Sequence, residues 1–167
     1  MINRTVHLSH WPRPWIGILV AFHLAVLGGY AVGFLNLVET RQLSPAGIET
    51  HLWGSDENAW EVEPLIPRKS LRELIITTHN HLLGLSSIFL IVGMLFVMTP
   101  SVPSRWRTIV AVEPFISLLL TFLFLWLTRF FHPGFAYLVL LSGILMHGAF
   151  LFMVLANLVV LFRGLSV

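Results

Sequence analysis

Residues 72–98 read RELIITTHNHLLGLSSIFLIVGMLFVM, and this stretch decides the fold. It is long and apolar enough to cross a bilayer, which needs about 20 apolar residues in a helix. Polar residues nevertheless lie inside it, namely Thr77, Thr78, His79, Asn80 and His81. Polar side chains are costly in hydrocarbon and usually serve a function, so the same stretch is the first place to look for a site.

The composition supports a membrane protein. The chain has 167 residues, of which 56% are hydrophobic and only 11% charged, and its mean hydropathy is +0.84. A soluble domain carries about 25% charged residues. The absence of cysteine excludes disulfides, thiolate metal sites, thiol catalysis and covalently attached c-type haem. No basic tract indicates nucleic-acid binding, whereas eight histidines are unusual in so apolar a chain.

Four apolar runs predict an all-α membrane protein, a single transmembrane domain over residues 1–167. The spans are placed at about residues 15–38, 71–98, 108–130 and 135–162, with an acidic loop over 39–69. Ser70 and Glu73 have the spacing of a capping box at the start of the second span. Short connections make the later spans antiparallel neighbours, so we expect an up-down four-helix bundle. The first run is longer than the apolar region of a signal peptide, and we expect it to be retained.

Arginines in the flanking segments predict the orientation. Arg4, Arg13, Arg105, Arg107 and Arg163 all fall on one side of the expected bundle. The positive-inside rule then places both termini in the cytoplasm and the acidic loop in the periplasm of a bacterial inner membrane. Arg68, Lys69 and Arg72 lie on the opposite side, against this rule. Within the loop, residues 45–53 are expected to form a short amphipathic helix on the membrane.

Away from their ends, the expected spans contain His23, His79, His81, His147 and Glu113. Counting ~1.5 Å per residue from the outer ends puts His23 at ~22 Å, His81 at ~16 Å and His147 at ~18 Å depth, which predicts one common layer. His79 and His81 are about 200° apart around a helix, so they cannot serve one site together. The two side chains therefore point in different directions, and the sequence does not show which of them belongs to the site.

These histidines suggest a haem b site. Haem iron accepts neutral imidazoles from facing helices of a bundle. The pairs to consider are His79 or His81 with His147, and His23 with either. The structural alternative for each position is a histidine hydrogen-bonded across helices. A non-haem metal site is not expected, because it requires three or more ligands in one place.

Glu113 begins a partial polar stripe in the third span. Ser117, Thr121 and Thr128 follow it at helical spacing, so the stripe should face the bundle interior. One interpretation gives Glu113 a role with protons or a quinone. The other is a glutamate near the start of the helix, close to the cytoplasmic interface and just before Pro114.

Three segments carry a family resemblance. KSLRELIITTHNHLLGLSSIFLIVGMLF at 69–96, EPF at 113–115 and SGILMHG at 142–148 resemble a group of small four-span bacterial membrane proteins that often accompany respiratory or multihaem cytochrome systems. More loosely, the layout is similar to four-helix b-type cytochromes, which pass electrons between quinones and water-soluble carriers. The resemblance implies His79, His81 and His147 as ligand candidates. His23 departs from its pattern.

Two hypotheses for the function follow. The first is an integral membrane electron-transfer subunit with haem b, an electron carrier rather than an independent enzyme. Its acidic loop would dock a periplasmic cytochrome through charge complementarity. The alternative is a non-catalytic accessory subunit that packs against a larger membrane or cytochrome complex. A proton or metal-ion conductor through Glu113 and the histidine layer is a third, less favoured interpretation. No motif of hydrolytic catalysis is present.

Overall fold

The computed structural model describes residues 11–40, 42–55, 66–99 and 102–165. These residues form helices and connections and contain no strand. The elements are α1 (Arg13–Glu39), α2 (Pro45–Trp53), α3 (Leu71–Val97), α4 (Ser104–Phe130), the short 3-10 turn η2 (Pro133–Phe135) and α5 (Ala136–Leu165). Among the described residues, four helices are long and apolar enough to cross a membrane, which confirms the predicted fold class. Helices α1, α4 and α5 extend one to four residues beyond the predicted spans at one or both ends, whereas α3 ends one residue before its predicted bound.

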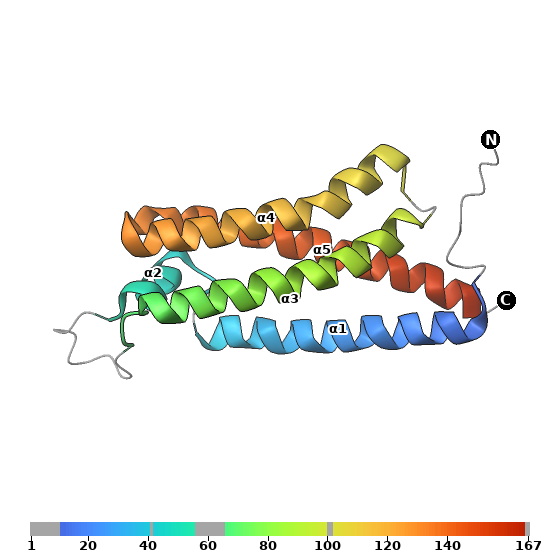
Figure 1. Cartoon of the computed structure of the whole chain (residues 1–167), viewed down its shortest axis with the longest axis horizontal. Helices are drawn as coiled ribbons and strands as arrows, with labels where there is room; N and C mark the ends of the chain where they lie inside the picture. The colour runs from blue at the N-terminus through green and yellow to red at the C-terminus, as the bar shows by residue number, and fades with distance from the viewer. Residues whose placement is uncertain (1–10, 41, 56–65, 100–101, 166–167) are drawn as a thin grey trace.

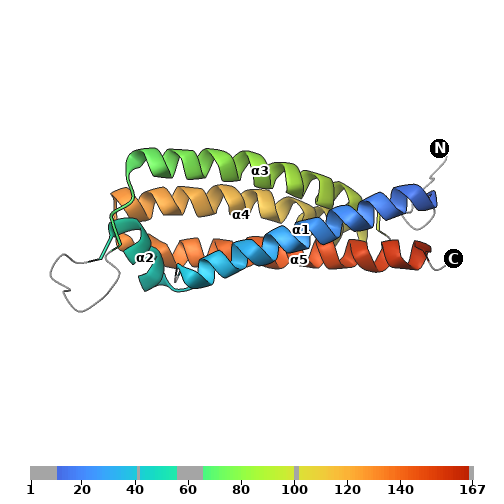
Figure 2. The same ribbon diagram turned by 90° about the horizontal axis from the view of Figure 1, so that it is seen from below.

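The four long helices lie side by side along the longest axis of the molecule (Figure 1). The start of α1 and the end of α5 lie at the same end of the bundle, as an up-down arrangement requires (Figure 2). The short helix α2 lies at the opposite end, where it covers the ends of α4 and α5. We call this opposite end the α2 end. Residues 56–65 of the acidic loop are outside the described residues.

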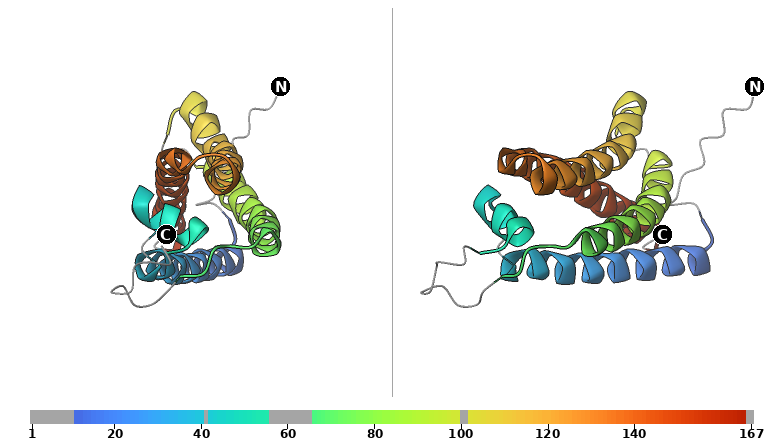
Figure 3. Two further views of the ribbon diagram at one scale, coloured as in Figure 1. Left: turned by 90° about the vertical axis from the view of Figure 1, so that its left-hand side faces the viewer. Right: turned by 60° about the vertical axis from the view of Figure 1, so that its left-hand side comes forward.

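Helix α5 is the centre of the bundle. It packs against α1, α3 and α4, whereas α1 packs against α5 and makes no comparable interface with α3 or α4. Figure 3 shows α1 along one side of the bundle, with α3 and α4 approaching α5 from other directions. The main core joins α3, α4 and α5 through Phe89, Val92, Phe96, Leu118, Phe122, Met146, Phe150, Met153, Val154 and Leu158. In a bilayer, close packing of such side chains stabilises the bundle more than removal from water does.

The helix starts follow their local sequence. The Ser70 hydroxyl accepts from the Glu73 amide at 3.2 Å, and the Ser70 amide donates to the Glu73 carboxylate at 2.8 Å, so the predicted capping box is confirmed. Ser44 caps α2 by accepting from the Gly47 amide at 3.1 Å. Arg107 holds the other end of α3, because its Nη1 donates to the carbonyls of Val97 and Thr99. The positive charge of Arg107 also interacts favourably with the negative C-terminal end of the helix dipole.

Helix α4 bends away from α3 near its start (Figure 1). Pro114 lies inside α4 and supplies no amide for the helical ladder, which is the usual cause of such a bend. A cleft of 340 Å³ lies between the two helices and is lined by residues such as Phe89, Met94 and Phe115. Gly93 faces Ala111 here, since a Cβ at Gly93 would lie 3.7 Å from the Ala111 side chain.

The outer surface of the bundle is apolar. Large side chains such as Val32, Leu83, Leu119 and Ile144 point away from the core with more than half of their surface exposed. Only 6% of the most apolar window of α1 is buried inside the bundle. Lipid tails are the solvent that such a surface fits, so the chain is an integral membrane protein.

Candidate functional site

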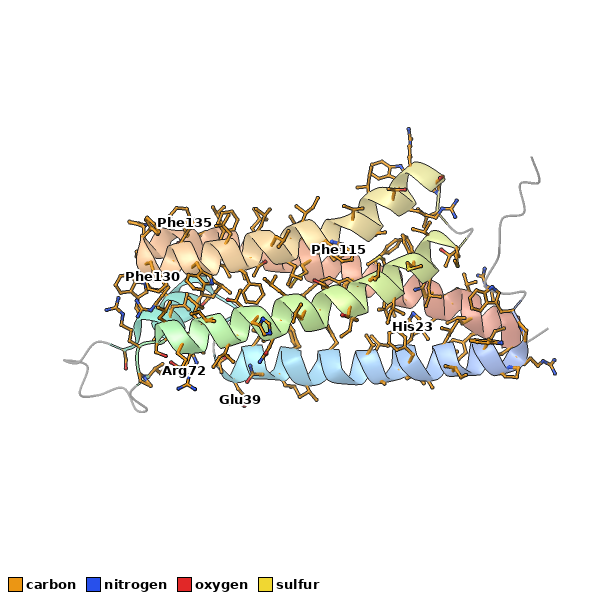
Figure 4. All side chains as sticks on the ribbon, in the orientation of Figure 1. His23, Glu39, Arg72, Phe115, Phe130 and Phe135 are labelled. Atoms are coloured by element: carbon orange, nitrogen blue, oxygen red, sulfur yellow. The ribbon has the colours of Figure 1, made fainter. Side chains whose placement is uncertain are left out.

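His23 belongs to a buried polar network that joins three helices. Its side chain is fully buried, between α1 and the rest of the bundle (Figure 4). Nδ1 lies 2.8 Å from the Leu19 carbonyl, and because a carbonyl only accepts, Nδ1 carries the proton. Nε2 therefore accepts from Asn157 Nδ2 at 3.1 Å. The same amide nitrogen donates to the Val92 carbonyl at 3.0 Å. Both ring nitrogens of His23 are thus engaged.

The Asn157–Val92 bond fixes the register of α5 against α3, which run in the same direction. His147 lies ten residues before Asn157, and His81 lies eleven residues before Val92. At ~1.5 Å per residue, both histidines lie ~15 Å from the Asn157 level toward the α2 end, so they share one layer. His23 lies at the Asn157 level instead. The expected layer therefore contains His81 and His147 but excludes His23, because α1 is shifted along α5 relative to the counted helix ends.

His81 has the hydrogen-bond pattern of a histidine that presents one free nitrogen. Its Nδ1 lies 2.9 Å from the Thr77 carbonyl and so carries the proton. Nε2 then has an available lone pair, and none of the described residues donates to it. Metal-ligating histidines commonly donate their other ring nitrogen to a carbonyl in this way. The ring lies 5.8 Å from that of Phe122 on α4.

His147 lies on the side of α5 that faces α1. Its ring makes an edge-to-face contact with Tyr30 of α1, with centroids 5.5 Å apart. Tyr30 also lies 6.0 Å from Phe150, which fixes the position of the phenol ring. No hydrogen bond links the His147 ring to another described residue, so its nitrogens are available for a ligand. The side chain is half-buried.

Glycines leave open space around the His81–His147 layer. A Cβ added at Gly84 of α3 or at Gly143 of α5 would meet nothing within 4 Å. The same holds for Gly33 of α1, one turn from Tyr30. Gly33, Gly84 and His81 are exposed, so the open space at these positions belongs to the outer surface of the bundle. Two imidazoles with apolar neighbours are donors of the kind that haem iron accepts.

The other polar residues of 77–81 have different environments. His79 is exposed and makes no ring contact or hydrogen bond with the described residues. It points away from His81, as their spacing predicted. The Thr78 hydroxyl accepts from Trp126 Nε1 at 3.0 Å and donates to the Leu74 carbonyl, so it ties α3 to α4. Asn80 is exposed.

Glu113 lies at the α4–α5 side of the bundle. The Ser117 hydroxyl donates to its Oε1, whereas Oε2 is buried and has no hydrogen-bond partner among the described residues. The groove beside it has a volume of 490 Å³ and is lined mainly by apolar residues such as Ile116, Leu120 and Leu145. The predicted polar stripe continues to Thr121, whose hydroxyl lies 2.8 Å from that of Ser142 on α5. No cation of the described residues pairs with Glu113.

Sequence reasoning missed two features. Asn157 was not singled out, although an amide deep in an apolar span is the same kind of signal as an intramembrane histidine. The second is an aromatic and cationic cluster at the α2 end, formed by Trp53, Arg68 and Arg129. Trp53 ends the helix predicted over residues 45–53 and suits the membrane interface, but no periodicity connects it with arginines so far apart in the chain.

The fold and the buried polar network define a small α-helical integral membrane protein. The chain belongs to the Aq_1264_TM family, described as a transmembrane helical domain, whose family model matches residues 42–165. The matched part contains α2 to α5 and leaves α1 outside. No curated protein and no solved structure matches the chain.

Proposed function

We propose that the protein is an integral membrane electron-transfer subunit that holds haem b through His81 of α3 and His147 of α5. The observation that carries this proposal is the Nε2 of His81, which presents a lone pair in the same layer as His147. His79 points elsewhere, and both ring nitrogens of His23 are used in hydrogen bonds. The choice among the four histidines therefore narrows to one pair.

The surrounding residues fit this role. The Thr77 carbonyl fixes the tautomer and orientation of His81, as second-shell groups do at metal sites. Tyr30 holds the His147 ring from the side of α1. Phe122 and Phe150 make the inner side of the layer apolar, and lipid would cover the exposed side of His81. Bound haem would supply one-electron redox chemistry, while these residues would bind it and set its surroundings.

The proposed orientation places the α2 end in the periplasm and the start of α1 in the cytoplasm of a bacterial inner membrane. Arg13 and Arg105 at the opposite end favour this orientation. The acidic loop would then face a periplasmic cytochrome with a basic surface. Its residues Asp56, Glu57, Glu61 and Glu63 lie outside the described residues.

Absorption spectroscopy of the purified full chain, expressed with adequate haem supply, tests the proposal. We expect a Soret band and an α-band with one haem per chain. His81→Ala and His147→Ala should each lose most of the haem, because each removes one proposed ligand. His79→Ala is the matched control and should retain it. A colourless, iron-free preparation of folded protein, or full retention of haem in both ligand variants, would refute haem ligation by this pair.

The accessory-subunit hypothesis is favoured by a separate observation on α1. Gly28 and Gly29 face open space, so this helix has small residues available for another transmembrane helix. A larger membrane complex would then co-purify with the chain and persist in His81→Ala. Gly29→Leu should weaken this association, whereas Val32→Leu should not. Purification of the chain alone under mild solubilisation would argue against this second function.

A further inference from the structure

The α2 end of the bundle holds two arginines against one tryptophan. Helix α2 docks here through Ile48 and Leu52, which are 3% and 2% exposed. Trp53 follows them, and its Nε1 donates to the Thr128 carbonyl of α4 at 2.8 Å. The indole ring is therefore held by both the α2 packing and a hydrogen bond to α4. A ring fixed in this way is a rigid platform for cations.

Both guanidinium groups lie close to this ring. The Cζ of Arg68 is 4.7 Å from the Trp53 ring centroid, and the Cζ of Arg129 is 5.9 Å from it. Arg129 is only 8% exposed, its Nε donates to the Lys69 carbonyl at 2.9 Å, and its Cζ lies 5.0 Å from the Phe130 ring. We call Trp53, Arg68 and Arg129 the arginine–tryptophan cluster.

The two guanidinium groups of the cluster form no ion pair with the described residues. Among them, the one ion pair at this end joins Lys69 Nζ to Glu73 Oε1 at 3.9 Å. No described carboxylate pairs with Arg68 or Arg129, whereas Arg72 is an exposed cation of the same end outside the cluster (Figure 4). Like charges held together repel one another, so an anion bound between them would be favoured.

The position of the cluster selects the anion. Arg129 lies in the last turn of α4, and Trp126 and Phe130 lie beside it in the sequence. Aromatic and basic residues at the end of a spanning helix lie at the level of the lipid headgroups. A guanidinium presents paired N–H donors that match phosphate oxygens. We propose that the arginine–tryptophan cluster binds the phosphate of an anionic phospholipid headgroup. This holds whichever leaflet the α2 end faces, and it is independent of haem.

Native mass spectrometry of the full chain in micelles that contain equal amounts of phosphatidylglycerol and phosphatidylcholine tests the proposal. The wild type should retain phosphatidylglycerol in preference to phosphatidylcholine. Arg68→Gln should reduce this retention about tenfold, the effect of one charge-assisted hydrogen bond. Arg68 is exposed, so its substitution should not prevent folding. Arg68→Lys should also weaken retention, because it keeps the charge but loses the paired donors.

Arg72→Gln is the matched control, since Arg72 is an exposed cation of the same region without a contact to Trp53 among the described residues. It should leave lipid retention unchanged. Equal retention of the two lipids, or equal effects of Arg68→Gln and Arg72→Gln, would overturn the proposal. Displacement of phosphatidylglycerol by millimolar inorganic phosphate would also overturn it, because the ligand would then be free phosphate.

Discussion

At the scale of single residues, one amide connects three helices. Asn157 of α5 donates to His23 of α1 and to the Val92 carbonyl of α3. Its own Oδ1 is buried without a hydrogen-bond partner among the described residues. This residue therefore both joins the helices and holds one unsatisfied acceptor. Such polar contacts specify how helices align in a medium where apolar packing has little directionality.

Asn157→Leu should destabilise the bundle by about 1–2 kcal/mol, because it removes two cross-helix hydrogen bonds and leaves His23 Nε2 unpaired in a dry interior. Asn36→Leu on the exposed face of α1 is the control. Reversible unfolding in mixed micelles measures the difference. Equal stability of the two variants would contradict a structural role for this network.

The different directions of His79 and His81 could be predicted from sequence, because side chains two positions apart lie about 200° apart around a helix. The partner of His23 could not. Depth counted from helix ends assumes that all helices begin at one plane, and α1 does not keep that register with α5. Only the observed bond to Asn157 shows the shift. The preference for His81 also depends on a hydrogen bond to Thr77 that composition cannot reveal.

At the scale of elements, the length of α2 follows from its sequence, whereas its position depends on contacts with the rest of the bundle. It was predicted as a short helix over residues 45–53, and the structure places it at those residues. Its docking against the bundle, through Ile48, Leu52, Leu74, Ala136 and Val139, could not be predicted. Amphipathic periodicity shows which face of a helix is apolar, but a membrane surface and a bundle end satisfy that face equally well.

Gly54 ends α2 with φ +88, a backbone conformation that favours glycine. A Cβ there would lie 2.8 Å from the Ile66 carbonyl oxygen. Gly54→Ala should therefore destabilise α2 docking by more than about 1 kcal/mol. Gly17→Ala in α1 meets nothing within 4 Å and should be neutral or stabilising by about 0.5–1 kcal/mol. Thermal unfolding compares the two, and an equal response would contradict this constraint.

Acid should loosen α2. Burial lowers the pKa of His51 below its ordinary value of 6.5, the positive charge of Lys69 lowers it further, and Glu73 partly opposes them. The docked helix therefore binds fewer protons than the undocked helix. Docking is strongest above pH 6.5, the ordinary pKa of histidine, and weakens as the pH falls below it. Hydrogen exchange of α2 amides should speed up relative to the bundle core between about pH 8 and about pH 5. His51→Gln should remove this pH dependence of α2 exchange. If the pH dependence persisted in the variant, another titrating group would cause it.

At the scale of the whole molecule, sequence was sufficient for the number of spans and their up-down order. Apolar length and short connections determine both. The unequal role of the helices was not predictable, since all four runs are similarly apolar. The structure shows that α5 is central and that α1 packs mainly against α5.

The orientation can be tested without interference, because the chain contains no cysteine. Two single cysteines serve as reporters, Glu49→Cys and Ser104→Cys. Glu49 lies on α2 and Ser104 at the start of α4, at opposite ends of the bundle (Figure 1). If the start of α1 faces the cytoplasm, a membrane-impermeant thiol reagent should label Glu49→Cys in intact spheroplasts and Ser104→Cys only after permeabilisation. The reverse pattern would place the α2 end in the cytoplasm.

The central position of α5 also has a consequence for how the protein is made. Chains enter the membrane from the N-terminus onward, so α5 is the last of these helices to be synthesised. Until it inserts, α3 and α4 can pair with each other, but α1 lacks the surface against which it packs. Helix α1 therefore lacks its main packing partner in the bilayer until α5 inserts. A ribosome that stalls before α5 would leave α1 exposed to the quality-control proteases of the membrane.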